Sequence, residues 1–159
     1  MYLINIPKWQ RWFFPGAIFS KKEENIVYLT FDDGPNTGIT DDVLTILESY
    51  NAKATFFCLG KNAEKMPDLL CKIVENGHAI GNHGYEHING WRTIDKTYIE
   101  NVEKGKSILQ SNLFRPPYGK ITVSQFLKLR KDNSIIFWDI MPGDFDDTIT
   151  NEKCLKNAL

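Results

Sequence analysis

Residues 26–35 read IVYLTFDDGP, an apolar run that ends in two adjacent carboxylates and a Gly-Pro turn. β-Branched and aromatic residues fill positions 26–31, and this composition predicts a buried β-strand. Because Asp32 and Asp33 follow directly, the strand is expected to present two acids at its carboxyl end. The same ten residues therefore bear on the fold and on the position of a site.

Beyond residue 35 the chain alternates short apolar runs with patterns typical of amphipathic helices. Further strands are predicted at 54–59, 78–81, 112–114 and 134–138. Helices are predicted after Thr40, from Pro67 to Gly77, after Asp95, near Thr122 and near Thr150. Alternation of this kind favours a parallel sheet with crossover helices, either an open doubly wound sheet or a (β/α) barrel.

The composition sets limits on the class of protein. The 159 residues are 42% hydrophobic and 25% charged with a formal net charge of -1, which fits one globular domain. The near-neutral net charge gives no sign of a basic surface that would bind a nucleic acid. No apolar run is long enough to span a bilayer. We therefore expect a monomer without nucleic-acid partners, and three reduced cysteines because none forms a C-x-x-C pair.

Residues 1–22 differ in composition and are expected to form an aromatic and basic N-terminal arm ahead of a domain at 23–159. This segment has four basic residues, no acid and six aromatic residues. Two interpretations stay open: the arm packs over the domain, or it makes a peripheral contact with a membrane or envelope surface. Its uncharged run at 12–20 is too short for a cleaved signal peptide.

Polar residues follow several of the predicted strands. They are Asp32 and Asp33 after the first strand, His83 and His87 after the third, Arg115 after 112–114, and Asp139 and Asp144 after 134–138. In parallel α/β folds the carboxyl ends of the strands meet at one edge, where ligands bind. The sequence therefore predicts that these segments converge on one site.

The two histidines suggest a metal centre at that edge. His83 and His87 are four residues apart, a spacing expected to place both rings on one side of a helical turn, and Asp33 would complete a set of two histidines and one carboxylate. The adjacent charges of Asp32 and Asp33 would repel each other unless a cation or a guanidinium separates them. Ordinary surface histidines beside a polar turn are the alternative.

Three segments together resemble the motifs of the polysaccharide deacetylase family, also called the NodB homology domain or carbohydrate esterase family 4. They are Thr30-Phe31-Asp32-Asp33-Gly34-Pro35, His83-Gly84-Tyr85-Glu86-His87 and Arg115-Pro116-Pro117-Tyr118-Gly119. Their order and spacing match, and the likeness extends over residues 26–145. The resemblance implies a distorted (β/α) barrel and metal-dependent removal of acetyl groups, usually N-acetyl, from a glycan.

The resemblance also implies roles for single residues. Asp33, His83 and His87 would hold a divalent metal, zinc first, with cobalt or manganese as alternatives. Asp32 would be the general base, and Arg115 would keep it ionised and oriented. The backbone N–H of Tyr118 would stabilise the oxyanion. Asp144 matches an acid that tunes a catalytic histidine, and the substrate would be contacted by Pro117, Tyr118 and Phe145.

The sequence departs from the family pattern near its end. Phe145 stands where the family has tryptophan, and the family's last motif, Leu-x-His, has no counterpart before Leu159. We therefore expect a barrel without its final strand and helix, and catalysis impaired by loss of the general acid. Two alternatives remain: an inactive metal-bearing carbohydrate-binding protein or gene fragment, and a metal-dependent phosphohydrolase, although no glycine-rich phosphate loop is present.

Substrate and location stay open at this level. Peptidoglycan, chitin-like oligomers and acetylated xylan are not distinguished by the sequence. The family resemblance implies an envelope-associated or extracellular protein, whereas the lack of a signal peptide and the unpaired cysteines favour the cytoplasm.

Overall fold

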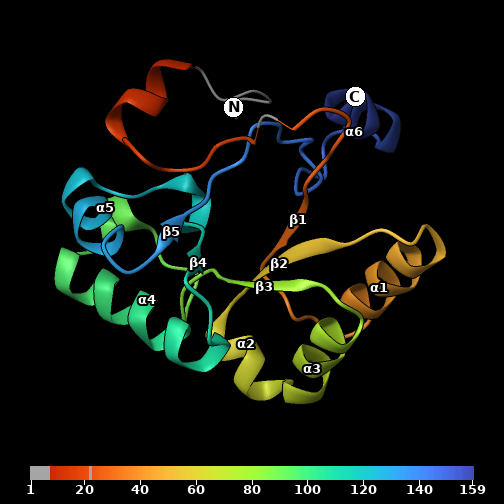
Figure 1. The fold of residues 1–159 in the computed structure, drawn as a ribbon, viewed down its shortest axis with the longest axis horizontal. Coiled ribbons are helices and arrows are strands. Elements are labelled where there is room, and N and C mark those ends of the chain that lie inside the picture. The colour runs from red at the N-terminus through yellow and green to blue at the C-terminus, as the bar shows by residue number, and fades with distance from the viewer. Residues whose placement is uncertain (1–7, 22) are drawn as a thin grey trace.

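The computed structural model describes residues 8–21 and 23–159, the side chains of 8–10 excepted, so residues 1–7 and 22 of the expected N-terminal arm lie outside it. Five parallel strands form one sheet in the order β1-β2-β3-β4-β5 (Figure 1). Their bounds are Leu29–Asp32, Ala54–Cys58, Ala79–Asn82, Leu113–Phe114 and Ser134–Ile135. The boundary expected between the arm and the domain stays a prediction.

The strand order decides between the two predicted architectures. A doubly wound sheet reverses its order at a switch point, whereas here every strand pairs with its neighbour in the chain. Within the described residues β1 and β5 are not paired with each other, so the sheet is an open, distorted (β/α) barrel. The predicted α/β fold class is confirmed.

Helices connect successive strands. Their bounds are Ile39–Ser49 (α1), Gly60–Lys65 (α2), Pro67–Glu75 (α3), Asp95–Leu109 (α4), Val123–Leu129 (α5) and Asn151–Ala158 (α6). Short 3-10 helices span Lys8–Phe13 (η1), Gly90–Arg92 (η2) and Pro117–Gly119 (η3). Figure 1 shows α1 to α5 around the outside of the sheet and α6 set apart from them. None of the described helices is long and apolar enough to cross a bilayer.

Local sequence explains where several helices begin and end. Pro67 opens α3, and Gly77 follows its end with a φ of 77°. Thr122 caps α5 in a reciprocal capping box with Gln125, and the Thr150 side chain caps α6. The sequence analysis missed α2, because six residues are too few to show a helical apolar period.

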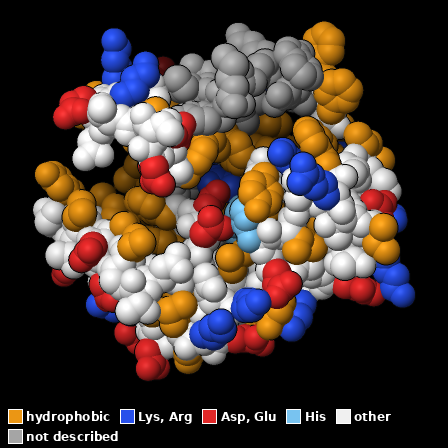
Figure 2. All heavy atoms as spheres, turned by 180° about the vertical axis from the view of Figure 1, so that it is seen from behind, with side chains coloured by type: hydrophobic (Ala, Val, Ile, Leu, Met, Phe, Trp, Pro, Cys, Tyr) orange, Lys and Arg blue, Asp and Glu red, His pale blue; other side chains and the backbone are white. Residues whose placement is uncertain are grey.

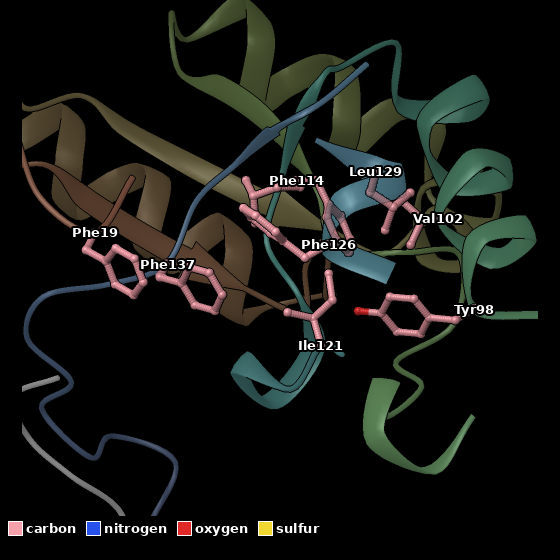
Figure 3. Close-up of a cluster of buried hydrophobic side chains, with 9 residues drawn as sticks. Phe19, Tyr98, Val102, Phe114, Ile121, Phe126, Leu129 and Phe137 are labelled. Atoms are coloured by element: carbon pink, nitrogen blue, oxygen red, sulfur yellow. The ribbon is translucent and has the colours of Figure 1, made fainter. Parts of the chain in front are cut away.

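Two groups of buried side chains make the core. The first lies between β4, β5, α4, α5 and the N-terminal segment, and includes Tyr98, Phe114 and Phe126 (Figure 3). The second lies between β1–β3 and the helices α1 to α3. Phe19 stacks on Phe137 with ring centroids 4.7 Å apart, and Ile18 pairs with Ile136 beside β5. Residues 14–19 therefore belong to the packed body of the protein.

The first predicted strand is shorter and more exposed than its sequence indicates. Regular structure begins only at Leu29, and Val27 is 81% exposed. The prediction of a buried strand at 26–31 was wrong because β1 is the edge of the sheet and has a neighbour on one side only. Its carboxyl end, however, lies where the sequence predicts it.

Candidate metal and catalytic site

The carboxyl ends of β1, β3 and β4 lie at the same edge of the sheet, with β2 between β1 and β3. Asp32 is the last residue of β1, His83 follows β3, and Arg115 follows β4. The register is continuous, because Asp32 pairs with Phe57 and Asn82 pairs with both Cys58 and Phe114. The predicted convergence is therefore confirmed for the segments after β1, β3 and β4, but not for Asp139 and Asp144 after β5.

Asp33, His83 and His87 form a compact cluster of metal donors. Asp33 Oδ1 lies 3.7 Å from His83 Nε2 and 3.4 Å from His87 Nε2. One donor atom from each residue lies within 4.8 Å of the other two. Figure 2 shows histidine atoms beside acidic side chains in a recess of the surface. The three donors are close enough to share one ion.

The hydrogen bond of His83 fixes which ring nitrogen is available. Its Nδ1 lies 2.8 Å from the carbonyl oxygen of Arg115. A carbonyl only accepts, so Nδ1 carries the proton and Nε2 presents its lone pair toward Asp33. Burial lowers the pKa of His83, which keeps the ring neutral. Two imidazoles and one carboxylate with this tautomer fit a divalent cation such as zinc.

The histidine segment is not the helical turn that the four-residue spacing suggests. Residues 83–87 form an irregular loop between β3 and η2, and Gly84 adopts a φ of 88°. A Cβ at Gly84 would lie 2.7 Å from Asn101 Nδ2. The two rings meet, with centroids 5.0 Å apart, because the loop folds back rather than because a helix aligns them.

Asp32 has a different partner from its neighbour. Arg115 Nη1 donates to Asp32 Oδ1 at 2.7 Å and lies 2.8 Å from Thr30 Oγ1. Arg115 Nη2 donates to the carbonyl of Phe137 at 3.0 Å. The guanidinium is 4% exposed and lies 4.1 Å from the Phe57 ring. The two adjacent acids are thus separated, one facing a guanidinium and the other facing imidazoles.

Tyr118 stands next to the metal donors. Its ring centroid lies 4.2 Å from that of His87, and its φ is 58° within the η3 turn. Among the described residues none accepts a hydrogen bond from its backbone N–H. The amide is thus available to a ligand, as an oxyanion donor requires. Pro117, in contrast, is buried, so its ring supports the shape of the turn and is not part of the exposed surface.

Other residues that the sequence singles out lie apart from this cluster. The structure shows no contact of Asp144 with the described donors, and its carboxylate is exposed. Phe145 is 61% exposed, and Asp139 pairs with Arg11 at 3.0 Å. His78 lies at the opposite end of the sheet, where its Nδ1 accepts from Ala54 N–H at 3.3 Å.

Cys58 is close to the donors but is not suited to bind metal. Burial first, and the charge of Asp32 second, raise the pKa of its thiol to about 12. The group therefore stays protonated near neutral pH and acts as a packing residue.

The sequence analysis missed three residues that shape the site: Thr30, Asn82 and Asn101. Thr30 had a signal, because it is a polar residue in an apolar strand and shares its face with Asp32. Asn82 is fully buried at the end of β3. Asn101 lies in the middle of α4, where nothing in the sequence relates it to a loop that precedes the helix.

Comparison with known proteins gives one consistent result. Residues 19–134 match the family described as polysaccharide deacetylase. A peptidoglycan-N-acetylglucosamine deacetylase of Bacillus cereus is 40% identical over 136 residues, covering 79% of this chain and 50% of that protein. The peptidoglycan-N-acetylmuramic acid deacetylase PdaC of Bacillus subtilis is 32% identical over 142 residues, covering 86% and 30%.

A solved structure agrees with these relatives. The crystal structure of a peptidoglycan N-acetylglucosamine deacetylase in complex with an N-oxidanyl-benzamide superimposes with a TM-score of 0.82 and 34% identity. The match covers 89% of this chain and 69% of that one. The chain spans half of the length of the Bacillus cereus relative and less than half of PdaC.

Proposed function

Because the chain belongs to the polysaccharide deacetylase family, we propose that it is a metal-dependent hydrolase that removes N-acetyl groups from peptidoglycan. One observation carries the proposal: two adjacent acids at one strand end have separate partners, Asp33 in a donor cluster with two histidines and Asp32 on a buried guanidinium. The choice of peptidoglycan is supported by the names of the relatives, which are deacetylases of that polymer.

Asp33, His83 and His87 would hold the metal, with zinc as the first candidate and cobalt or manganese as alternatives. A divalent cation held there supplies a Lewis acid for the acetyl carbonyl and lowers the pKa of water toward about 7. The Nδ1–H of His83 stays bonded to the Arg115 carbonyl, so its Nε2 remains available as a donor.

Asp32 is suited to be the general base. Arg115 donates to one carboxylate oxygen, Oδ1, so the other oxygen is available to take a proton from the attacking water. The buried guanidinium is itself fixed by the Phe137 carbonyl and by Thr30. The backbone N–H of Tyr118 would then donate to the oxygen of the tetrahedral intermediate.

The leaving amine needs a proton when the C–N bond breaks. Of the three histidines in these 159 residues, two belong to the donor cluster and His78 lies at the other end of the sheet. No imidazole of this chain is placed to supply that proton. We therefore propose that the 159 residues by themselves turn over slowly, while they keep the metal site, the base and the oxyanion donor.

We propose that the exposed aromatic residues of η1 make a peripheral contact with a membrane or envelope surface. Trp12 is 86% exposed and Phe13 57%, while Phe14 and Phe19 pack inward. Exposed Trp and Phe beside basic residues are typical of interfacial segments. Co-sedimentation with anionic lipid vesicles, lost in Trp12→Ala, is the expected result; equal recovery of both proteins in the supernatant would contradict it.

A zinc titration by calorimetry, followed by an acetate assay on N-acetylated peptidoglycan fragments, tests the main proposal. We expect one zinc per chain, lost in Asp33→Ala and in His87→Ala. His78→Gln is the matched control, because it removes an imidazole at the other end of the sheet. Acetate release should be lost in the two variants that lose zinc and kept in the wild type and His78→Gln.

Three outcomes would count against the proposal. A folded chain that binds no zinc overturns the metal site. Zinc binding with glycan binding but no acetate favours a carbohydrate-binding protein without catalysis. Release of phosphate from phosphate esters in place of acetate favours a phosphohydrolase.

A further inference from the structure

The loop that carries His83 and His87 is bonded to one turn of α4, and the start of α2 also holds it, because the N–H groups of Gly60 and Lys61 donate to the carbonyls of Gly84 and Tyr85 at 2.9 and 3.0 Å. Tyr85 N–H donates to Asn101 O at 3.0 Å, and Asn82 Nδ2 donates to Val102 O at 2.9 Å. Asn82 Oδ1 in turn accepts from Gly84 N–H at 2.8 Å. These bonds connect the backbone of the loop to two consecutive residues of the helix.

Asn101 contributes two side-chain hydrogen bonds to this contact. Its Oδ1 accepts from the N–H of Glu86, and its Nδ2 donates to the carbonyl of Glu86, both at 2.9 Å. A primary amide has one acceptor and one donor on the same plane, so it can bind both peptide groups of one residue. A carboxylate of the same size offers acceptors only.

The helix and the loop are in contact at the level of their backbones. A Cβ at Gly105 would lie 2.5 Å from Asn82 Oδ1 and 2.7 Å from the carbonyl carbon of Gly84. The absence of a side chain at Gly105 thus lets α4 approach closely enough for Asn101 to reach Glu86. This approach sets the position of the loop together with the bonds from α2 and the ion pair between Lys61 Nζ and Glu86 Oε1 at 2.8 Å.

The two histidines depend on the contact to different degrees. His83 is fixed by other bonds, because its N–H donates to the Cys58 carbonyl and its ring is buried against the Arg115 carbonyl. The His87 side chain is 26% exposed, and its described contacts are Asp33 and two aromatic rings. The backbone that precedes His87 is Glu86, which Asn101 holds.

We propose that Asn101 is a positioning residue for the metal site, which acts by fixing the Glu86 peptide groups so that His87 Nε2 faces Asp33. The inference rests on the proposed metal site at Asp33, His83 and His87. Asn101 touches none of these donors directly, so its role is to set the geometry of one of them.

The test compares zinc affinity and loop protection in four proteins: the wild type, Asn101→Ala, Asn101→Asp and Val102→Ala. Loss of a residue that orients a ligand typically weakens metal affinity by about 10- to 100-fold, which we expect for Asn101→Ala. Asn101→Asp keeps the acceptor for the Glu86 N–H but loses the donor to the Glu86 carbonyl. Its zinc affinity should therefore lie between those of the wild type and Asn101→Ala. Val102→Ala creates a cavity in the same turn but keeps every bond to the loop, so its zinc affinity should stay near the wild-type value.

Hydrogen exchange of the Glu86 amide, measured without metal, gives a second readout. Exchange should become faster in Asn101→Ala and stay slow in Val102→Ala. Wild-type zinc affinity in Asn101→Ala, or an equal loss in Val102→Ala, would overturn the positioning role while leaving the metal site intact. A wild-type chain that binds no zinc would overturn the proposed function and the inference with it.

Discussion

At the scale of single residues, the site depends on giving two neighbouring carboxylates different surroundings. Asp33 leaves the strand with a φ of 68°, which turns it toward the histidines, while Asp32 keeps the strand direction and meets Arg115. Left-handed backbone is uncommon for residues other than glycine, although aspartate tolerates it well. The change of direction within one peptide unit separates the base from the metal donors.

Asp32→Asn should separate catalysis from metal binding. An amide cannot take a proton from water, so we expect acetate release to fall by about 10²- to 10⁴-fold. Zinc affinity should change little, since Asp32 is outside the donor cluster. Parallel acetate assays and zinc titrations check this. A variant that loses both properties together would show that Asp32 acts as a ligand.

Arg115→Ala should destabilise the fold as well as the site. The change leaves Asp32 and the Phe137 carbonyl without their donor, and removing one partner of a buried ion pair typically costs about 3–5 kcal/mol. Asp32 is one-third exposed, so we expect a value near the lower end. Urea unfolding measures it, with the exposed Arg130→Ala as control. Equal midpoints for the two variants would contradict the role of the pair.

The positions of Asp32, Asp33 and His83 at strand ends were predictable because each follows a predicted strand and lies in a segment that matches a family motif. Arg115 was predictable for the same reason. Asn101 was not, because its contact with Glu86 depends on how closely α4 approaches the loop, and that distance is set by Gly105, Gly84 and Asn82 in three dimensions. Asp144 was expected in the site from the motif alone, and the structure shows no contact there.

At the scale of elements, pattern predicted the buried helices well and the sheet edge poorly. In α4 the apolar residues Tyr98, Val102 and Leu109, spaced as on one face of a helix, are all buried. The apolar Ile46 of α1 is 58% exposed, and Tyr50, which directly follows this helix, is 80% exposed. Both belong to the segment that follows β1, the edge strand of the described sheet.

The junction between β2 and β3 should make stability depend on acid pH through His78. Burial, and next the charge of Lys53, lower the pKa of His78 from its ordinary value of 6.5, and its Nδ1 accepts a bond from Ala54 N–H. The unfolded chain therefore binds the proton first. The stabilising contribution is complete above about pH 6.5 and is lost as the pH falls through the folded-state pKa.

Urea midpoints of the wild type and His78→Gln between about pH 7 and pH 5 check this expectation. Both proteins contain His83 and His87, so the difference between their pH profiles isolates His78. The wild type should lose more stability over this range. Parallel profiles would show that His78 does not titrate differently on folding.

The packing of α4 against β4 contains one polar atom without a partner. Tyr98 is fully buried, and no described residue forms a hydrogen bond with its hydroxyl. Burial also raises the pKa of this hydroxyl. Tyr98→Phe removes a desolvated hydroxyl and keeps the ring, so we expect stability to rise by about 1 kcal/mol. A calorimetric melting temperature below that of the wild type would show that the hydroxyl has a bonding partner, such as a buried water.

At the scale of the whole molecule, the open barrel brings Asp32, the cluster of Asp33, His83 and His87, and the turn of Tyr118 to one end of the sheet. A short extension that carries a family-like Leu-x-His segment after residue 159 should raise acetate release by at least about tenfold, because a positioned general acid contributes that much or more. The same extension with Leu-x-Ala is the control. A gain below tenfold, or equal gains from both extensions, would contradict the idea that slow turnover results from the lack of an imidazole that protonates the leaving amine.

The chain-order arrangement of the strands also bears on how the protein emerges from the ribosome. Since each strand pairs with the one made just before it, β1 to β5 can join the sheet in the order of their synthesis. The pairing of Ile18 with Ile136 is different, because Ile18 precedes β1 and Ile136 follows β5. The rings of Phe14 and Phe19 therefore stay exposed during synthesis until β5 and Phe137 have been made.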